Sequence, residues 1–361
     1  MTFACAKPGL LFDPGKRYAG EVLVRDIGIG FDAGEEETPW YGSVEKEDLD
    51  RFLTRTPMGN KGTFGKVLVL AGSGAMCGAA VLCARAVLAS GAGMVKVVTE
   101  ERNRTPLFCA LPEAMADFWK EDEPLPEEAL LQDLAWADAV VAGPGLSKSR
   151  TAKELLVFTV QHTEVPLVLD ADALNLIAED AEILSGCRAE KILTPHVGEL
   201  ARLLHTTIAE CQREPAGSAG RAAEKYQACC VRKDSVTVTA EEGREQYYIN
   251  TSGSSALATA GSGDVLAGIT GAFAAKRQCE KNEKKSACQN SGTGGICAWK
   301  GGRGCGRKKQ CFLCNSIRDY QRIAVNLSKA DQNHGFPKGL RADFFEVPDE
   351  ICEYLRKNRQ Y

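Results

Sequence analysis

Long apolar runs and an excess of one charge are both missing from this chain of 361 residues. No segment approaches the roughly 18 apolar residues of a membrane-spanning helix, and residues 1–16 lack the charged region and apolar block of a secretory signal. The 44 Lys and Arg residues nearly balance the 48 Asp and Glu residues, for a net charge of −4. No global field therefore favours nucleic acid or an anionic membrane, and we expect a cytoplasmic protein with neither partner.

Cysteine, in contrast, is abundant, and its distribution divides the chain. Eight of the 15 cysteines precede Ala275, in apolar contexts where a thiol behaves as a small hydrophobic group. The other seven crowd the last quarter. The length and the 44% apolar content allow a full hydrophobic core in one large or two ordinary domains, which excludes a small disulfide scaffold.

A regular alternation of strand, turn and helix begins at Lys66. Residues 67–71 form a short apolar run that ends in a Gly-rich turn, an Ala-rich helix is expected over residues 79–89, and a second strand over 94–98. The same alternation recurs at 139–142, 166–170 and 191–194. The sequence thus predicts a layered α/β domain with a mostly parallel sheet. Residues 235–249 alternate polar and β-branched residues around a turn, which indicates an antiparallel hairpin at one edge.

The most informative short segment is Gly261-Ser262-Gly263-Asp264, just before a second helical run. Glycines allow the backbone to approach a phosphate closely, and a helix that begins at about Asp264 directs free N–H groups to the same place. We expect the helix dipole to keep the Asp264 carboxylate ionised, so that it can accept the proton of a hydroxyl beside the phosphate. The alternative is an ordinary Gly-rich turn with an Asp at a helix start.

Several blocks in order resemble one family. Residues 250–268, with this segment at their centre, are similar to the signature of the ADP-dependent NAD(P)H-hydrate dehydratases, a branch of the ribokinase-like superfamily. The further matching blocks are residues 60–73, 76–80 with 91–95, 112–115, 142–146, 169–174 and 193–200. The resemblance spans about residues 58–275 and implies a ribokinase-like layered α/β/α fold.

What the resemblance implies is repair of (6S)-hydrated NADH or NADPH: phosphorylation of the hydrate hydroxyl at the expense of ADP or ATP with Mg²⁺, then phosphate elimination. Asp264 is then the catalytic base. The implied contacts to hydrated NAD(P)H are Ala79, Gly145, His196 and Asp264. The implied contacts to the nucleotide are Lys233, Asp234, Ser235, Val236, Thr237, Gly261, Ser262 and Gly263. The family also implies a homo-oligomer, a homotetramer or larger.

Each role implied by the resemblance has a simpler structural alternative. His196 at a strand end is also typical of a hydrogen-bonded structural histidine, and Gly145 and Ala79 of tight packing. For Asp170 and Asp172 we favour a strand-end turn that lines the cleft, because no metal-ligand spacing requires more. Lys233 could be a solvated strand end, and Asp234-Ser235 replaces a Gly that the family often has there. No protein metal ligands are predicted.

The two ends depart from the family pattern. Residues 1–30 resemble the closing segment of an epimerase domain without its catalytic body, so we expect no epimerase activity. Residues 31–57 read as a linker, 58–276 as the dehydratase domain and 277–361 as an atypical tail without apolar periodicity up to 310. The codons of Ala298 to Gly301 and of 311–322 are compatible with family-like sequence in another frame, so we hypothesise a frameshift between about 276 and 298, which the DNA sequence would test.

Other functions remain open on the sequence alone. A kinase of a small alcohol or vitamin precursor would share the Gly261–Asp264 site but retain its phosphorylated product. A frameshifted chain could be an inactive homologue or scaffold. The tail also offers a nucleic-acid binder through basic residues 300–309 with Trp299, or a zinc module at Cys305, Cys311 and Cys314, although a second ligand pair is missing. Residues 344–355 could form an amphipathic helix.

Overall fold

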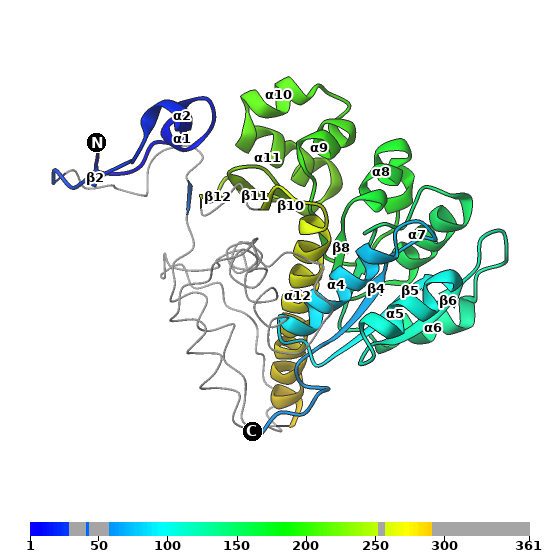
Figure 1. The fold of residues 1–361 in the computed structure, drawn as a ribbon. Helices are drawn as coiled ribbons and strands as arrows, with labels where there is room; N and C mark the ends of the chain where they lie inside the picture. The colour runs from blue at the N-terminus through cyan, green and yellow to red at the C-terminus, as the bar shows by residue number, and fades with distance from the viewer. Residues whose placement is uncertain (29–40, 43–57, 252–256, 291–361) are drawn as a thin grey trace.

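The computed structural model describes residues 1–28, 41–42, 58–251 and 257–290. Within these ranges, ten strands form one large twisted sheet (Figure 1). In spatial order, the strands are β3 (Tyr41–Gly42), β12 (Tyr247–Asn250), β11 (Thr237–Glu241), β10 (Ala228–Arg232), β9 (Lys191–Leu193), β8 (Leu167–Leu169), β7 (Ala139–Ala142), β4 (Lys66–Leu70), β5 (Met94–Glu100) and β6 (Met115–Trp119).

The pairing of these strands confirms the predicted mostly parallel sheet. Every pair from β10 to β6 is parallel, whereas β11 pairs antiparallel with both β10 and β12. The hairpin predicted at the sheet edge is therefore present as β11 and β12. It is not the outermost element, because β3, from the segment read as a linker, pairs in parallel with β12.

Helices cover both faces of the sheet because its central strands are apolar on both sides. Val67 and Val69 of β4 face one hydrophobic cluster, and Leu68 and Leu70 face the other, as the two-residue period of a strand dictates. The helices of this layered domain are α4 (Cys77–Ala89), α5 (Arg104–Ala110), α6 (Glu127–Trp136), α7 (Arg150–His162), α8 (Asp172–Glu179), α9 (Val197–Leu204), α10 (Ile208–Arg213), α11 (Pro215–Tyr226) and α12 (Ser262–Asn290). Short 3-10 turns span Glu101–Asn103 and Ala181–Leu184.

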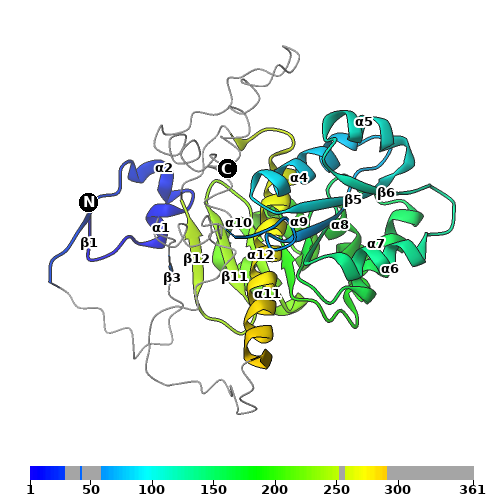
Figure 2. The same cartoon turned by 90° about the horizontal axis from the view of Figure 1, so that it is seen from below.

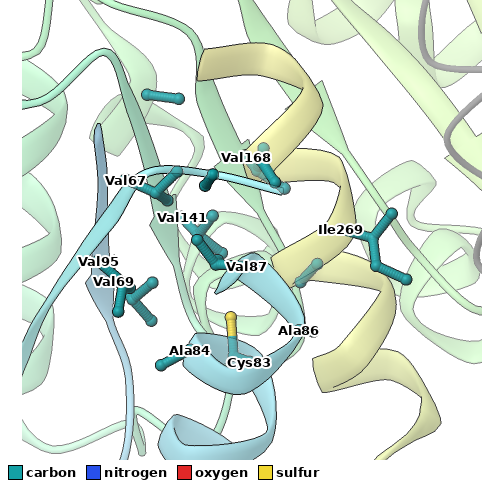
Figure 3. Close-up of a cluster of buried hydrophobic side chains, with 14 of the residues drawn as sticks. Val67, Val69, Cys83, Ala84, Ala86, Val87, Val95, Val141, Val168 and Ile269 are labelled. Carbon is teal, nitrogen blue, oxygen red and sulfur yellow. The ribbon is translucent and has the colours of Figure 1, made fainter. Parts of the chain in front are cut away.

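The face that carries α4 and α12 is packed very closely (Figure 3). A Cβ atom at Gly268 of α12 would lie 2.2 Å from the backbone oxygen of Cys83 in α4, so only glycine allows this approach. Figure 3 shows Cys83 and Val87 of α4 gathered over valines of the sheet, and Ile269 of α12 belongs to the same hydrophobic cluster. The two helices thus form one rigid layer with the sheet.

Helix α12 continues well beyond the predicted domain boundary at residue 276. It runs to Asn290, and Figure 1 shows it as one long helix beside α4. Arg277 and Lys281, one turn apart, each form an ion pair with Glu190, at 2.7 and 3.3 Å. The expectation that this stretch lacks helical structure is therefore wrong up to residue 290, because helix-favouring Lys, Glu and Gln residues and surface ion pairs replace an apolar period. The remaining tail hypotheses, including the three cysteines and residues 344–355, lie outside the described residues.

The N-terminal segment, residues 1–28, is built from short helices and strands. It forms α1 (Pro8–Leu11), α2 (Gly15–Ala19) and a two-stranded parallel sheet of β1 (Thr2–Phe3) and β2 (Val24–Arg25). Phe12 packs against the hydrophobic cluster beneath α9, α10 and α11, and Figure 2 shows these short helices at the β12 side of the sheet. Across the described residues, no helix is long and apolar enough to cross a membrane.

Candidate active site

The order of strands in the sheet determines where a ligand can bind. From the centre, β4, β5 and β6 follow one another in one direction, and β7, β8, β9 and β10 in the other. In open parallel sheets of this kind, ligands bind at the carboxyl ends of the strands, at the point where the order reverses. Here that point lies between β4 and β7, where Gly72 N–H donates to the carbonyl of Pro144 across the gap at 2.9 Å.

Two residues predicted to contact the substrate meet at this point. Gly145, in the turn after β7, has a φ of +58°, and a Cβ there would lie 2.8 Å from the Cβ atoms of both Ala79 and Met76 of α4. The absence of a side chain at Gly145 therefore sets how closely the turn approaches α4. Ala79 is half-buried and Met76 is exposed, so this contact borders the solvent. The structure brings Ala79 and Gly145 together.

The predicted phosphate cradle lies at the start of α12. The helix begins at Ser262, two residues earlier than expected, after Gly261 with a φ of +88°. A Cβ at Gly261 would lie 2.5 Å from Leu82 Cδ1 of α4, and the positive φ disfavours any residue with a side chain there. The first turn of a long helix presents free backbone N–H groups and a partial positive charge. The geometry fits an anion at this position.

Asp264 lies in that first turn and is less acidic than expected. Burial, and secondarily the charge of Asp170, raise its pKa to about 6, although Lys233 acts in the opposite direction and Asp172 adds a further increase. We expected the helix dipole to keep this carboxylate ionised, and removal from water acts against that effect and raises the pKa. At neutral pH the carboxylate is still mostly charged, with a proton affinity well matched to a general base.

A buried ion pair lies beneath the same turn. Lys233 Nζ is 2.6 Å from Asp170 Oδ1, and Thr194 Oγ1 donates to the same oxygen at 2.8 Å. The position of a Cβ at Gly263 would be 3.5 Å from Lys233 Nζ and 3.7 Å from Asp170 Oδ2. Lys233 is therefore not a solvated strand end: 20% of its side chain is exposed, and its ammonium lies beside the cradle.

The other residues implied to contact the nucleotide form the connection from β10 to β11. Asp234 and Ser235 are exposed, Val236 is buried, and Thr237 begins β11. Asp234, which replaces the Gly often found in the family, accepts hydrogen bonds from Arg232 Nη2 at 3.0 Å and from the Ser235 N–H at 2.7 Å. The acidic side chain thus stabilises the turn locally.

His196 caps the N-terminus of α9. Its Nδ1 accepts hydrogen bonds from the N–H groups of Gly198 (2.9 Å) and Glu199 (3.3 Å), and Glu199 Oε2 accepts from the His196 N–H at 2.8 Å. Burial, with the charges of Lys233 and Arg202, lowers the pKa of His196. A neutral ring with Nδ1 as acceptor carries its proton on Nε2. His196 therefore has the structural, hydrogen-bonded role that was the alternative to substrate contact. In addition, 54% of its side chain is exposed and accessible to a ligand.

His196 and Lys233 are also neighbours through their backbones. The two residues form a parallel bridge that extends the pairing of β9 and β10, and the Lys233 N–H donates to the Pro195 carbonyl at 2.8 Å. The residues implied by the resemblance thus lie along one edge of the sheet, with α12 between the Ala79–Gly145 contact and the His196–Lys233 bridge.

In the part of the chain that the structure describes, protein side chains form no metal site beside these residues. No group of three or more His, Cys, Asp or Glu side chains there is placed to hold an ion. The carboxylates at the site are instead engaged by protein donors: Asp170 by Lys233, and Asp172 by the Ser147 N–H at 2.8 Å.

Sequence reasoning missed the partners that organise the site. Asp170 was interpreted as a simple turn residue, and Thr194 and Glu199 received no role. Glu199 is buried, and burial raises its pKa even though Lys233 acts against the shift. The available signal was positional: Asp170 and Thr194 directly follow apolar strands whose carboxyl ends must meet at one edge of a parallel sheet.

Comparison with known proteins agrees with this arrangement. The profile of a family described as "NAD(P)H-hydrate dehydratase" matches residues 67–301, which is more than half of the chain. The chain belongs to the NAD(P)H-hydrate dehydratase family. The "ADP-dependent (S)-NAD(P)H-hydrate dehydratase" of Neisseria meningitidis serogroup B is 39% identical over 231 residues, which cover 62% of this chain and 74% of that protein.

Bifunctional members of the NAD(P)H-hydrate dehydratase family are longer than this chain. The "Bifunctional NAD(P)H-hydrate repair enzyme" of Moorella thermoacetica is 37% identical over 291 residues, which cover 76% of this chain but 53% of that enzyme. The chain thus spans about half the length of such relatives. Among solved structures, the ADP/ATP-dependent NAD(P)H-hydrate dehydratase of Bacillus subtilis, co-crystallised with ATP/Mg²⁺, matches with a TM-score of 0.60 and 25% identity over 90% of this chain and 98% of its own. The ribokinase-like fold expected from the sequence is confirmed.

Proposed function

We propose that this chain restores (6S)-hydrated NADH or NADPH to NAD(P)H in an ADP-dependent hydro-lyase reaction. Family membership supports this assignment. The single structural observation that carries it is the placement of Asp264, a carboxylate with a pKa of about 6, in the first turn of α12 beside Lys233 and the Gly261–Gly263 cradle. A base and an anion site within one helical turn suit phosphoryl transfer to an alcohol.

The chemistry proceeds in two steps. Asp264 accepts the proton of the hydrate hydroxyl while the hydroxyl oxygen attacks the terminal phosphorus of ADP, and AMP leaves. The carbon–oxygen bond of the resulting phosphate ester then breaks, phosphate departs, and loss of a proton from the adjacent carbon restores the double bond of the nicotinamide ring. The N–H groups at the start of α12 and the ammonium of Lys233 stabilise the charge on the transferring phosphoryl group.

The substrate and the nucleotide approach Asp264 from opposite sides. We assign the hydrated nicotinamide to the contact between Ala79 and Gly145, with His196 at the far end of the same edge. The nucleotide occupies the cradle and the Lys233–Thr237 connection. Mg²⁺ enters with the phosphates of the nucleotide, because this ion retains several waters and binds through phosphate oxygens, and no side-chain cage for it is found in the described ranges.

Recovery of the nicotinamide absorbance tests the assignment. The protein is incubated with (6S)-hydrated NADH or NADPH and Mg²⁺, with ADP, with ATP or without nucleotide, and released phosphate is measured in parallel. We expect absorbance and phosphate to rise together, and only with nucleotide. Asp264→Asn removes the base and should abolish both signals, whereas Glu127→Gln, an exposed acidic residue in the first turn of α6, should retain them.

The same assay separates the proposed dehydratase from a kinase of a small alcohol. A kinase would convert ATP to ADP and retain a phosphorylated product, without free phosphate or recovered absorbance. Absence of both signals from the parent protein, at any nucleotide, would refute the dehydratase assignment. We further propose a homo-oligomeric cytoplasmic enzyme, and light scattering during gel filtration measures its mass.

A further inference from the structure

Asp170 has no role in the chemistry proposed above, yet it is the most completely enclosed charge at the site. Its side chain is 2% exposed and follows β8 directly. Its Oδ1 oxygen receives both the ammonium of Lys233 and the hydroxyl of Thr194. A buried carboxylate oxygen that already accepts from an ammonium and a hydroxyl is poorly placed to receive a proton from a substrate hydroxyl. Its contacts instead point to a role in arranging other groups.

The contacts of Asp170 join four elements at one place. The Asp170 N–H donates to the Ala142 carbonyl at the end of β7, and Thr194 follows β9. Lys233 follows β10. Gly263 belongs to the first turn of α12, and a Cβ atom built on it would lie 3.7 Å from Asp170 Oδ2. A single carboxylate thus ties three strand ends together beneath the cradle.

Lys233 needs such a partner because its side chain is long and flexible. A free lysine samples many rotamers, and its ordering on ligand binding carries an entropic cost. The 2.6 Å contact to Asp170 holds the ammonium at the position that is 3.5 Å from the Cβ site of Gly263. The cost of ordering this charge is therefore met during folding and not during catalysis.

We propose that Asp170 is a positioning residue of the nucleotide site: its carboxylate fixes the ammonium of Lys233 beside the first turn of α12, where it faces the transferring phosphate. The identification of the ligand as a transferring phosphate rests on the proposed function, whereas the placement of Lys233 does not. Asp172, two residues later, provides a natural contrast, because it accepts from the Ser147 N–H and makes no contact with Lys233.

Chemical labelling of Lys233 tests the placement without any activity measurement. The parent, Asp170→Asn and Asp172→Asn proteins are treated with an acetylating reagent, and the acetylation rate of Lys233 is followed by peptide mass spectrometry, with exposed Lys148 as internal reference. Loss of the Asp170 charge lowers the pKa of Lys233, and each pKa unit raises its free-amine fraction about tenfold. We expect a rise of that order in Asp170→Asn and less than about twofold in Asp172→Asn.

Activity measurements then connect the placement to catalysis. We expect kcat of Asp170→Asn to fall roughly 10- to 100-fold, because a misplaced charge no longer meets the phosphoryl group. The acidic limb of the kcat/KM profile should move to lower pH, because Asp264 loses one of the groups that face it, while Lys233, Asp172 and the Cys83 thiol remain. A loss of folded protein alone would lower kcat at every pH and leave this limb unchanged.

The outcomes are separable. Unchanged Lys233 acetylation in a folded Asp170→Asn protein, or an equal rise in Asp172→Asn, would overturn the inference even if the enzyme is a dehydratase. Failure of the parent protein to restore hydrated NAD(P)H would overturn the proposed function, while the labelling still decides the placement. If Asp170→Asn does not fold, Thr194→Val removes one hydroxyl from the same carboxylate and should raise the labelling about two- to threefold; equal rates in this variant and the parent would refute the proposal.

Discussion

Replacement of Asp264 by asparagine should remove activity and at the same time stabilise the fold. The pKa of this carboxyl rises from an ordinary value of 3.8 to about 6, chiefly through burial and then through Asp170. The folded state therefore binds the proton more tightly than the unfolded state. The stability that this group contributes is fully present below pH 3.8 and is lost as the pH rises through about 6. Asparagine does not titrate and escapes that loss.

The size of the effect follows from the shift. At about 1.4 kcal/mol per unit, the shift corresponds to up to about 3 kcal/mol at pH 8 and about 1 kcal/mol at pH 4.5. Urea unfolding at these two pH values measures the difference in free energy of unfolding between Asp264→Asn and the parent. We expect the variant to be more stable at pH 8, with an advantage that shrinks towards acid pH. A melting temperature at pH 8 should rise by at least about 2 °C.

Glu127→Gln is the matched control for this measurement. Glu127 is also an acidic residue in the first turn of a helix, α6, but it is exposed. Its removal should cost about 0.3–1 kcal/mol through lost interaction with the helix dipole. The reasoning about Asp264 would be refuted by a variant that is less stable than the parent at pH 8, or by an advantage of equal size at both pH values.

Substitutions at three further positions test the geometry. Gly145→Ala should destabilise the protein by about 1–3 kcal/mol and raise the KM for the hydrate, because the new Cβ would lie 2.8 Å from that of Ala79; thermal melts and steady-state kinetics measure the two effects. His196→Ala should lose about 1 kcal/mol of stability with the helix cap, whereas His196→Asn, a good cap, should keep stability while the KM for the hydrate rises. Gly268→Ala should destabilise by at least about 2 kcal/mol in urea unfolding, because its Cβ would lie 2.2 Å from the Cys83 carbonyl, and unaltered stability would contradict the packing.

Periodicity was sufficient to predict the architecture of the sheet. The runs at residues 67–71 and 139–142 are apolar at every position, which is typical of strands buried on both faces, and both are parallel strands. Phosphate chemistry at Gly261–Asp264 could be proposed from the same sequence, although an ordinary Gly-rich turn remained the alternative until the resemblance was considered. Local patterns of this kind depend on neighbouring residues and are visible in one sequence.

Long-range electrostatics could not be inferred in the same way. The pKa of Asp264 depends on Asp170 and Lys233, which are distant in the sequence and meet only once the strands are ordered. The length of α12 was underestimated for a related reason: Arg277 and Lys281 pair with Glu190 from another part of the chain, and a search for apolar periodicity ignores such pairs. Short edge elements such as β3 carry too few residues for any pattern.

The position of α4 has a consequence for how this protein can change. One face of the helix contributes Cys83 to the contact with Gly268, while its exposed side carries Ala79 against Gly145 and Leu82 against Gly261. A core substitution that shifts α4 by a fraction of an ångström would therefore alter the spacing of Gly145 and Gly261 around this helix. Tolerance to mutation in this core should be limited by turnover before it is limited by folding. Laboratory evolution for higher thermal stability would then accumulate changes on the α6 and α7 side of the sheet.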